Sequence, residues 1–265
     1  MFKRIIFLFL LFLLPISSFA LRIDNPKVKL QLSPGDNYSG IIIVENPSSD
    51  EVSVKAYLED FIYVAPFDGA KEFYASGTTS VSLSNWITFS PQEFTLQPFA
   101  HRRVNFSISP ASFFNSVHCG VLFFETSIGT TYEDDKAINV LGRIGSLFFI
   151  EPQDKKKQAT FNDIKGSSYS LIGDFINSGN SFIHAQGTSF TLDSEDMVKD
   201  RGVLEELYLL PNDSTKLQIA LASDLTPGTY TMVITFDLEE DDSTIKEIDF
   251  SLSRSGEVTV LDERN

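Results

Sequence analysis

The most informative stretch of this sequence is Leu225-Thr226-Pro227-Gly228-Thr229-Tyr230. A Pro-Gly turn is followed at once by a tyrosine, and β-type runs flank it at residues 216–221 and 231–236. This is the pattern of a tyrosine corner, in which the tyrosine buries its ring and returns its hydroxyl to the backbone just upstream. We therefore predict an immunoglobulin-like β-sandwich here. A Pro-Gly turn that precedes a tyrosine by chance is the alternative.

Short β-type runs separated by turn residues extend through the rest of the chain. Residues 102–108 alternate apolar Val104 and Phe106 with polar Asn105 and Ser107, as in a strand with one buried face. No apolar stripe with helical spacing occurs, so we predict an all-β fold. The expected strands cover residues 27–32, 39–45, 51–63, 86–90, 102–108, 118–126, 137–150, 168–176, 181–192, 203–210, 216–221, 228–238 and 245–253.

The N-terminus has the features of a secretory signal peptide. Lys3 and Arg4 precede an apolar run over residues 5–14, and small residues precede the expected cleavage site after Ala20. The run is about half of the roughly 20 residues that a membrane span needs, which favours cleavage over an uncleaved anchor. We therefore expect a signal peptide over residues 1–20 and an exported mature protein, in the periplasm or another extracytoplasmic compartment, without membrane insertion.

The remaining length suits two sandwiches of about 100 residues each. The polar stretch Glu151-Pro152-Gln153-Asp154 follows the last expected strand of the first half. We predict the domain boundary there, because proline cannot continue a central strand. The predicted domains are an N-terminal immunoglobulin-like domain over residues 21–151 and a C-terminal one over residues 152–265.

Charge and composition restrict the partners. The formal net charge is −15 at pH 7, so the surface repels nucleic acid and anionic lipid. The only cysteine, Cys119, excludes an intramolecular disulfide, and we expect it in the core beside an exposed or hydrogen-bonded His118. The acidic run Glu239-Glu240-Asp241-Asp242 lacks the ligand spacing of a calcium loop, and we interpret it as a solvated hairpin tip.

Motifs for catalysis or cofactor binding are missing from the sequence. It has no phosphate-binding glycine loop, no Gly-x-Ser-x-Gly, no His-Glu-x-x-His and no paired-cysteine metal spacing. We therefore predict a non-enzymatic protein without cofactor or metal, and we expect Trp86 in the core. One alternative is an enzyme or carbohydrate-binding protein that uses a groove of aromatic residues, Phe61, Tyr63 and Phe67.

Three segments of the first half carry a family resemblance. One run ends as Ile43-Val44-Glu45-Asn46-Pro47, and Pro91-Gln92-Glu93-Phe94-Thr95-Leu96-Gln97-Pro98 follows later. The third, Arg143-Ile144-Gly145-Ser146-Leu147-Phe148-Phe149-Ile150, leads from an arginine through aromatic residues to Pro152. Together they resemble the periplasmic pilus-assembly chaperones of the PapD type, whose second segment has the form P-x-x-F-x-L-x-P-G. Phe99 stands where that family usually has glycine.

The resemblance implies a chaperone that completes an unfinished immunoglobulin-like subunit by lending it a β-strand. Ile138, Val140 and Ile144 are then the apolar residues offered to the subunit, with Gly142 between them. A plain core face of this strand is the alternative interpretation of the three residues.

The resemblance also implies a basic pair between the domains that holds the terminal carboxylate of the subunit. Lys27 or Lys29 stands for its first member, and Arg143 is the cation nearest to its second. Ser146 occupies the place of the expected lysine. Ordinary solvated cations are the alternative for all three basic residues.

The sequence thus predicts a protein-binding role, as a periplasmic chaperone or assembly factor for subunits of a secreted or surface assembly. A structural or adhesive surface protein with tandem sandwich modules is the alternative that the sequence leaves open.

Overall fold

The computed structural model of the chain describes residues 21–133, 136–240 and 242–265, and its regular elements there are β-strands. The all-β prediction is confirmed. The predicted signal peptide, residues 1–20, lies outside the described residues. In the part of the chain that is described, no helix has the length and apolar character needed to cross a membrane.

The first sandwich is built from the strands that precede residue 153. These are β1 (Arg22–Ile23), β2 (Lys27–Leu32), β3 (Tyr38–Glu45), β4 (Val52–Tyr63), β5 (Lys71–Ala75), β6 (Ile87–Ser90), β7 (Glu93–Leu96), β8 (His101–Ile108), β9 (His118–Glu133) and β10 (Lys136–Pro152). One sheet has the order β1-β3-β8-β6, and the other has the order β2-β10-β9-β4-β5, with β7 also paired to β4. Ile42, Val104 and Phe148 lie in the core between them without exposed surface.

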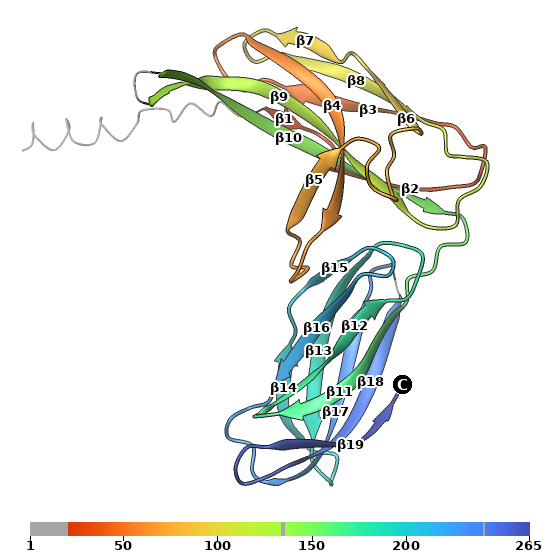
Figure 1. Cartoon of the computed structure of the whole chain (residues 1–265), viewed down its shortest axis with the longest axis vertical. Helices are drawn as coiled ribbons and strands as arrows, with labels where there is room; N and C mark the ends of the chain where they lie inside the picture. Colours follow the sequence, from red (N-terminus) through yellow and green to blue (C-terminus); the bar gives the residue numbers. More distant parts are fainter. Residues whose placement is uncertain (1–20, 134–135, 241) are drawn as a thin grey trace, which may run out of the picture.

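The second sandwich is built from the remaining strands. These are β11 (Ala159–Ser167), β12 (Ser170–Asn177), β13 (Ile183–Leu192), β14 (Val198–Val203), β15 (Leu207–Leu209), β16 (Ser214–Ala220), β17 (Gly228–Asp237), β18 (Ser243–Leu252) and β19 (Val258–Arg264). One sheet has the order β11-β12-β16, and the other has the order β14-β13-β17-β18-β19, with β15 paired to β13. Figure 1 shows the two sandwiches one above the other, with β9 and β10 extending sideways from the first.

The tyrosine corner predicted in the second sandwich is present. Tyr230 lies at the start of β17, its ring is buried, and its hydroxyl donates a hydrogen bond to the Thr226 carbonyl oxygen at 2.6 Å. The ring stacks on Phe250 of β18 with 5.7 Å between centroids. Together with the paired sheets, this contact confirms the immunoglobulin-like sandwich class.

Several strand limits differ from those that the sequence predicts. β9 continues to Glu133, and β10 continues through Pro152, where a loop was expected. Pro152 lies beyond the last pair of β10 with β9, Ile150 with His118, and only β2 pairs with it, so the missing N–H interrupts no second ladder. We propose that the two domains divide just after Pro152.

The strand expected over residues 203–210 is only partly present, because this range holds all of β15 but only the last residue of β14. β14 ends at Val203 and β15 begins at Leu207, and the two pair with different parts of β13. Between them the Leu204 amide donates to the Gly187 carbonyl oxygen at 2.8 Å. β1, β5, β7, β11, β19 and nearly all of β14 were not expected from the sequence.

A third core cluster joins the two sandwiches. Its centre is Phe182 of the second sandwich, which is fully buried. The ring centroid of Phe182 lies 4.6 Å from that of Phe149 and 5.4 Å from that of Tyr63, both in the first sandwich. Burial of a phenylalanine ring contributes about 1.5–3 kcal/mol, so this cluster fixes one sandwich against the other.

Main-chain hydrogen bonds reinforce this contact. The Val117 amide of the first sandwich donates to the Asn180 carbonyl oxygen, and the Tyr208 amide of the second donates to the Phe67 carbonyl oxygen, both at 2.8 Å. Figure 1 shows the end of the β4–β5 hairpin directed toward β15. The connection therefore involves the loop after β4 as well as the chain between β10 and β11.

The alternative of an aromatic ligand-binding groove at Phe61, Tyr63 and Phe67 is wrong. Phe61 has no exposed surface, Tyr63 is 4% exposed, and both belong to the cluster between the sandwiches. Phe67 is partly buried against the same cluster and against the second core. These aromatic side chains are interface core because their rings pack on one another, and they leave no surface for a ligand.

Cys119 and His118 lie as the sequence predicts. Cys119 is buried in the cluster between the sandwiches, and burial raises the pKa of its thiol. His118 is partly buried against Trp86, with 3.9 Å between ring centroids, and its Nδ1 lies 3.0 Å from the Ser82 carbonyl oxygen. Burial lowers the pKa of His118. Trp86 is a core residue, as expected.

Phe99 adopts a backbone conformation that L-residues avoid. Its φ is 57°, in the left-handed region, and its side chain is 69% exposed. Phe99 stands where the chaperones of the resembled family usually have glycine, the residue that this conformation favours. The phenylalanine ring gains little burial here, so the turn stores strain.

We expect Phe99→Gly to raise the free energy of unfolding by about 1 kcal/mol. Relief of left-handed strain, about 1–2 kcal/mol, exceeds the entropic cost of glycine. Urea unfolding followed by tryptophan fluorescence measures the change. Phe113→Gly is the control, because Phe113 is 77% exposed but has no positive φ, and it should not stabilise the protein. Equal effects of the two substitutions would contradict the strain argument.

Candidate functional site

β9 and β10 extend past the first sandwich as a two-stranded ribbon (Figure 1). β4 pairs with β9 only as far as the Lys55–Glu125 pair, and β2 pairs with β10 only from Leu147 onward. Within the described residues, the outer edges of β9 over 126–133 and of β10 over 136–145 therefore have no strand partner. We call these two segments the arm.

The arm brings together the three apolar residues predicted to contact a partner. Ile138 and Val140 are 40% and 37% exposed, and Ile144 is partly buried against the core of the first sandwich. Side chains two residues apart share one face of a strand, so the three form a row along β10. The row begins at the core and continues into solvent. Only Ile144 therefore fits the alternative interpretation, in which the three residues form a core face of the strand.

Arg143 points away from this row and is already paired. Its Nη1 atom lies 3.0 Å from Glu59 Oε2, and its guanidinium carbon lies 4.0 Å from the centroid of the Phe123 ring. The hydrogen bond to the Tyr57 hydroxyl and the charge of Glu59 raise the pKa of Arg143. Its charge is thus neutralised on the face opposite the row.

Lys29 is also paired, by the acidic run between β17 and β18. Its ammonium forms an ion pair with Glu239. Lys157, whose side chain has no exposed surface, lies 3.3 Å from both Glu239 and Glu240, and Lys155 pairs with Glu240. Glu239 and Glu240 follow β17 at the predicted hairpin tip, and Asp241 lies outside the described residues. The two glutamates are not simply solvated, because they pair with lysines at the junction of the sandwiches.

The position of Glu239 strongly affects its ionisation. Partial burial alone would raise the pKa of its carboxyl, but the hydrogen bond and charge of Lys29 and the charge of Lys157 outweigh burial and lower it to about 2. His184 Nδ1 also lies 3.3 Å from Glu239 Oε1. The ion pair between Lys29 and Glu239 links the two sandwiches directly.

Lys27 differs from the other basic residues of the site. In the described part of the chain, no carboxylate lies within ion-pair distance of its ammonium, which sits 5.2 Å from the Phe182 ring centroid and 5.6 Å from that of Phe149. Burial, and next the charge of Lys29, lower the pKa of Lys27. It is paired in register with Leu147, where the free edge of β10 ends.

Ser146 stands where the resembled chaperones have the second residue of the basic pair, and this position is buried. Its side chain has no exposed surface, and its hydroxyl donates to the Asn25 carbonyl oxygen at 2.7 Å. A lysine would not fit there without displacing the chain before β2. The structure therefore brings Lys27 and Lys29 together on one strand and leaves Arg143 apart from them.

Solved structures of fimbrial chaperone systems are similar to this chain over most of its length. A chain from a chaperone–tip adhesin complex of CFA/I fimbriae biogenesis is similar with a TM-score of 0.54 and 13% identity, over 85% of this chain and 96% of that chain. The class 5 fimbriae chaperone CfaA is similar with a TM-score of 0.53 and 12% identity, over 85% and 97%. The chain has the fold of the PapD-like fimbrial chaperones. No protein-family model matches it, and no curated protein matches it.

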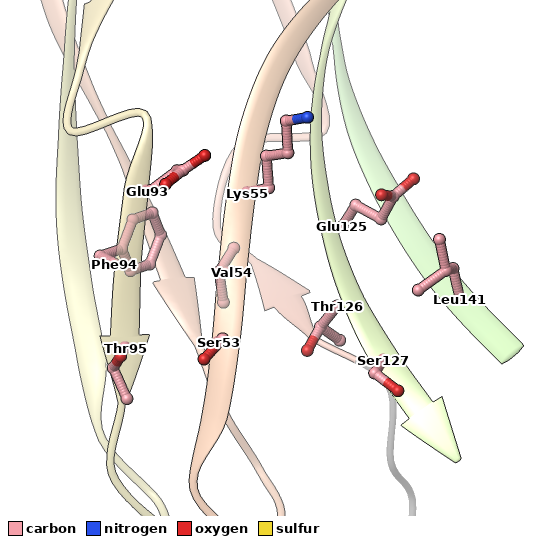
Figure 2. A pocket seen from close by; sticks show the side chains of 10 residues that line it. All are labelled: Ser53, Val54, Lys55, Glu93, Phe94, Thr95, Glu125, Thr126, Ser127 and Leu141. Atoms are coloured by element: carbon pink, nitrogen blue, oxygen red, sulfur yellow. The ribbon is translucent and has the colours of Figure 1, made fainter. Parts of the chain in front are cut away.

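The PapD-like fold leaves a hollow of about 470 Å³ at the root of the arm (Figure 2). It lies where β4 and β9 separate beyond the Lys55–Glu125 pair. The residues that line it are Ser53, Val54, Lys55, Glu93, Phe94, Thr95, Glu125, Thr126, Ser127 and Leu141. Across the described residues, no group of three or more His, Cys, Asp or Glu side chains is placed to hold a metal ion. This hollow has no signal in the sequence, because it forms where two strands that are far apart along the chain diverge in the sheet.

We expect Glu239→Gln to lower the free energy of unfolding at pH 7, because the ion pairs with Lys29 and Lys157 lose their anion. A carboxyl with a lowered folded-state pKa stabilises the protein above its unfolded pKa of about 4.5, and this contribution is lost as the pH falls toward about 2. The difference between the two proteins should therefore shrink below pH 4.5 and disappear as the pH falls through about 2. Urea unfolding across this pH range measures it, with the exposed Glu205→Gln as control. A difference independent of pH would contradict the ion-pair explanation.

Proposed function

We propose that this chain is a non-enzymatic chaperone or assembly factor that binds protein subunits of a secreted or surface assembly. The observation that supports this most strongly is the free edge of β10 over residues 136–145, with its row Ile138, Val140 and Ile144. The main-chain N–H and C=O groups of such an edge pair with a strand of another protein, while alternate side chains fill its apolar groove. The partner is then an immunoglobulin-like subunit that lacks one strand.

The exposed arm favours this function over that of a structural or adhesive surface module. A long unpaired strand edge with apolar side chains is a site of aggregation, and proteins usually shorten, charge or cover it. An edge that a subunit covers during transport serves a chaperone, whereas a stalk gains nothing from it. The likeness to CfaA and to a chain of a chaperone–tip adhesin complex supports the same choice.

We assign the capture of a terminal carboxylate to Lys27. No described carboxylate lies within ion-pair distance of its ammonium, and Lys27 lies beside the base of the free edge of β10. Lys29 and Arg143 already have carboxylate partners, so they serve the carboxylate less well. A subunit strand that runs along β10 toward Leu147 would end near the ammonium of Lys27.

The proposed compartment is the periplasm or another extracytoplasmic space. Residues 1–20 have the composition of a signal peptide, and the partner subunits of a surface assembly pass through that space. The net charge of −15 disfavours nucleic acid and anionic membranes as partners. Protein subunits remain the class of partner that suits both the arm and the charge.

Benzoylphenylalanine placed at position 138 should cross-link to one exported immunoglobulin-like subunit when the protein is expressed in its native envelope. Mass spectrometry of the adduct identifies the subunit, and its sequence should lack one strand of the sandwich. The control is the same probe at position 245, because Ile245 is 50% exposed but lies on the second sandwich. No adduct at 138, or the same adduct at both positions, would refute the proposed strand donation.

Lys27→Met should weaken binding of that subunit about 10–100-fold, the value of a lost hydrogen bond between charged groups. Lys71→Met is the matched control, because the Lys71 ammonium also lies over an interface ring, 4.8 Å from the Tyr63 centroid, but away from β10. Isothermal titration measures both affinities. A subunit whose C-terminus is amidated should bind the intact protein as weakly as the natural subunit binds the Lys27 variant. Equal losses for Lys27 and Lys71 would refute the assignment.

A further inference from the structure

Gly142 interrupts the apolar row of the arm. It lies between Val140 and Ile144 on the same face of β10, where a donated strand would be expected to present a further apolar side chain. In the sequence this glycine leaves a gap of one side chain in the row. The structure shows what fills the gap.

The neighbouring strand has a β-bulge opposite this position. Val140 pairs with Gly129, whereas Leu141 pairs with Ser127, so Ile128 has no residue across from it. Gly129, directly after the bulge, has a φ of 147°, which residues with side chains rarely adopt. The bulge adds one residue to β9 and leaves β10 regular.

The side chain of Ile128 occupies the space beside Gly142. A Cβ atom built on Gly142 would lie 2.8 Å from Ile128 Cγ2, closer than real Cβ atoms come to another carbon. Ile128 is therefore on the face of the row, and it is 40% exposed, the same fraction as Ile138. The gap left by the glycine is filled from the adjacent strand.

We propose that Ile128 is a further residue of the partner-binding row, so that a subunit contacts Ile138, Val140, Ile128 and Ile144 in succession. This inference rests on the proposed strand donation. The subunit groove that receives the arm then has an apolar wall on the side of β9, next to Gly142. A subunit groove that contacted only β10 would not cover Ile128, which would then stay exposed to solvent.

The same bulge makes the two edges of the arm unequal. Bulges interrupt regular pairing and twist a strand, and natural proteins use them to protect free edges. The edge of β9 is interrupted at Ile128, whereas the edge of β10 is regular over 136–145. The subunit strand therefore pairs with β10, and Ile128 contributes only its side chain.

A double-mutant cycle tests this inference. The binding partner in it is the free subunit that the cross-link at position 138 identifies. Ile128→Ala should weaken its binding about 10-fold, the loss expected for an apolar side chain buried by the partner. Gly142→Val alone should also weaken binding, because the added side chain collides with Ile128. Combining the two substitutions should restore affinity to within about 3-fold of the intact protein, because valine fills the row from β10 itself.

Tyr132→Ala is the control for the cycle. Tyr132 is 75% exposed on the same strand but pairs with Ala137, so its side chain lies on the opposite face of the arm. Its substitution should leave affinity unchanged. Urea unfolding of each variant verifies that the sandwiches remain folded, and benzoylphenylalanine at position 128 should give the same adduct as at position 138.

The outcomes separate this inference from the proposed function. If position 138 captures the subunit but Ile128→Ala binds it as well as the intact protein, strand donation stands and the role of Ile128 is refuted. A double variant no better than the two single variants refutes it as well. If position 138 captures no subunit, strand donation falls, and the role of Ile128 falls with it.

Discussion

The pairing of β10 over residues 147–152 is the constraint on which both the arm and the junction of the sandwiches depend. Over 147–150 β10 is held between β2 and β9, and over 151–152 it pairs with β2 alone, while nothing described pairs with its outer edge over 136–145. Phe148 and Phe149 lie on opposite faces of the held part, and Phe148 enters the core of the first sandwich while Phe149 packs on Phe182 of the second. The free edge is thus presented from a strand that is anchored on both faces.

The junction combines apolar packing with ion pairing that depends on it. A buried charge is costly unless it is paired, and the fully buried Lys157 has both Glu239 and Glu240 as partners. Lys29 completes this group across the junction. Glu239 and Glu240 form their ion pairs with these lysines, and no described carboxylate lies within ion-pair distance of Lys27.

The sequence allowed prediction of features that depend on local chemistry. The Tyr230 corner and the alternation of Ile138 and Val140 follow from residues next to one another. β5 and β19 escaped prediction because their side chains are mostly exposed, so they have no apolar period. The pairing of Lys29 with Glu239 has no local signal, since it depends on how the sandwiches meet. The bulge at Ile128 leaves only Gly129 as a trace in the sequence, and a glycine alone does not specify a bulge.

The position of Cys119 makes the only thiol of the chain unreactive. The thiol is buried in the cluster between the sandwiches, and burial keeps it protonated by raising its pKa. A thiol reacts as its thiolate, and this one has no exposed surface that another thiol could reach. As the sequence has no other cysteine, the folded molecule exposes no thiol that could form a disulfide with another protein. Folding of the chain therefore involves no disulfide bond within the molecule.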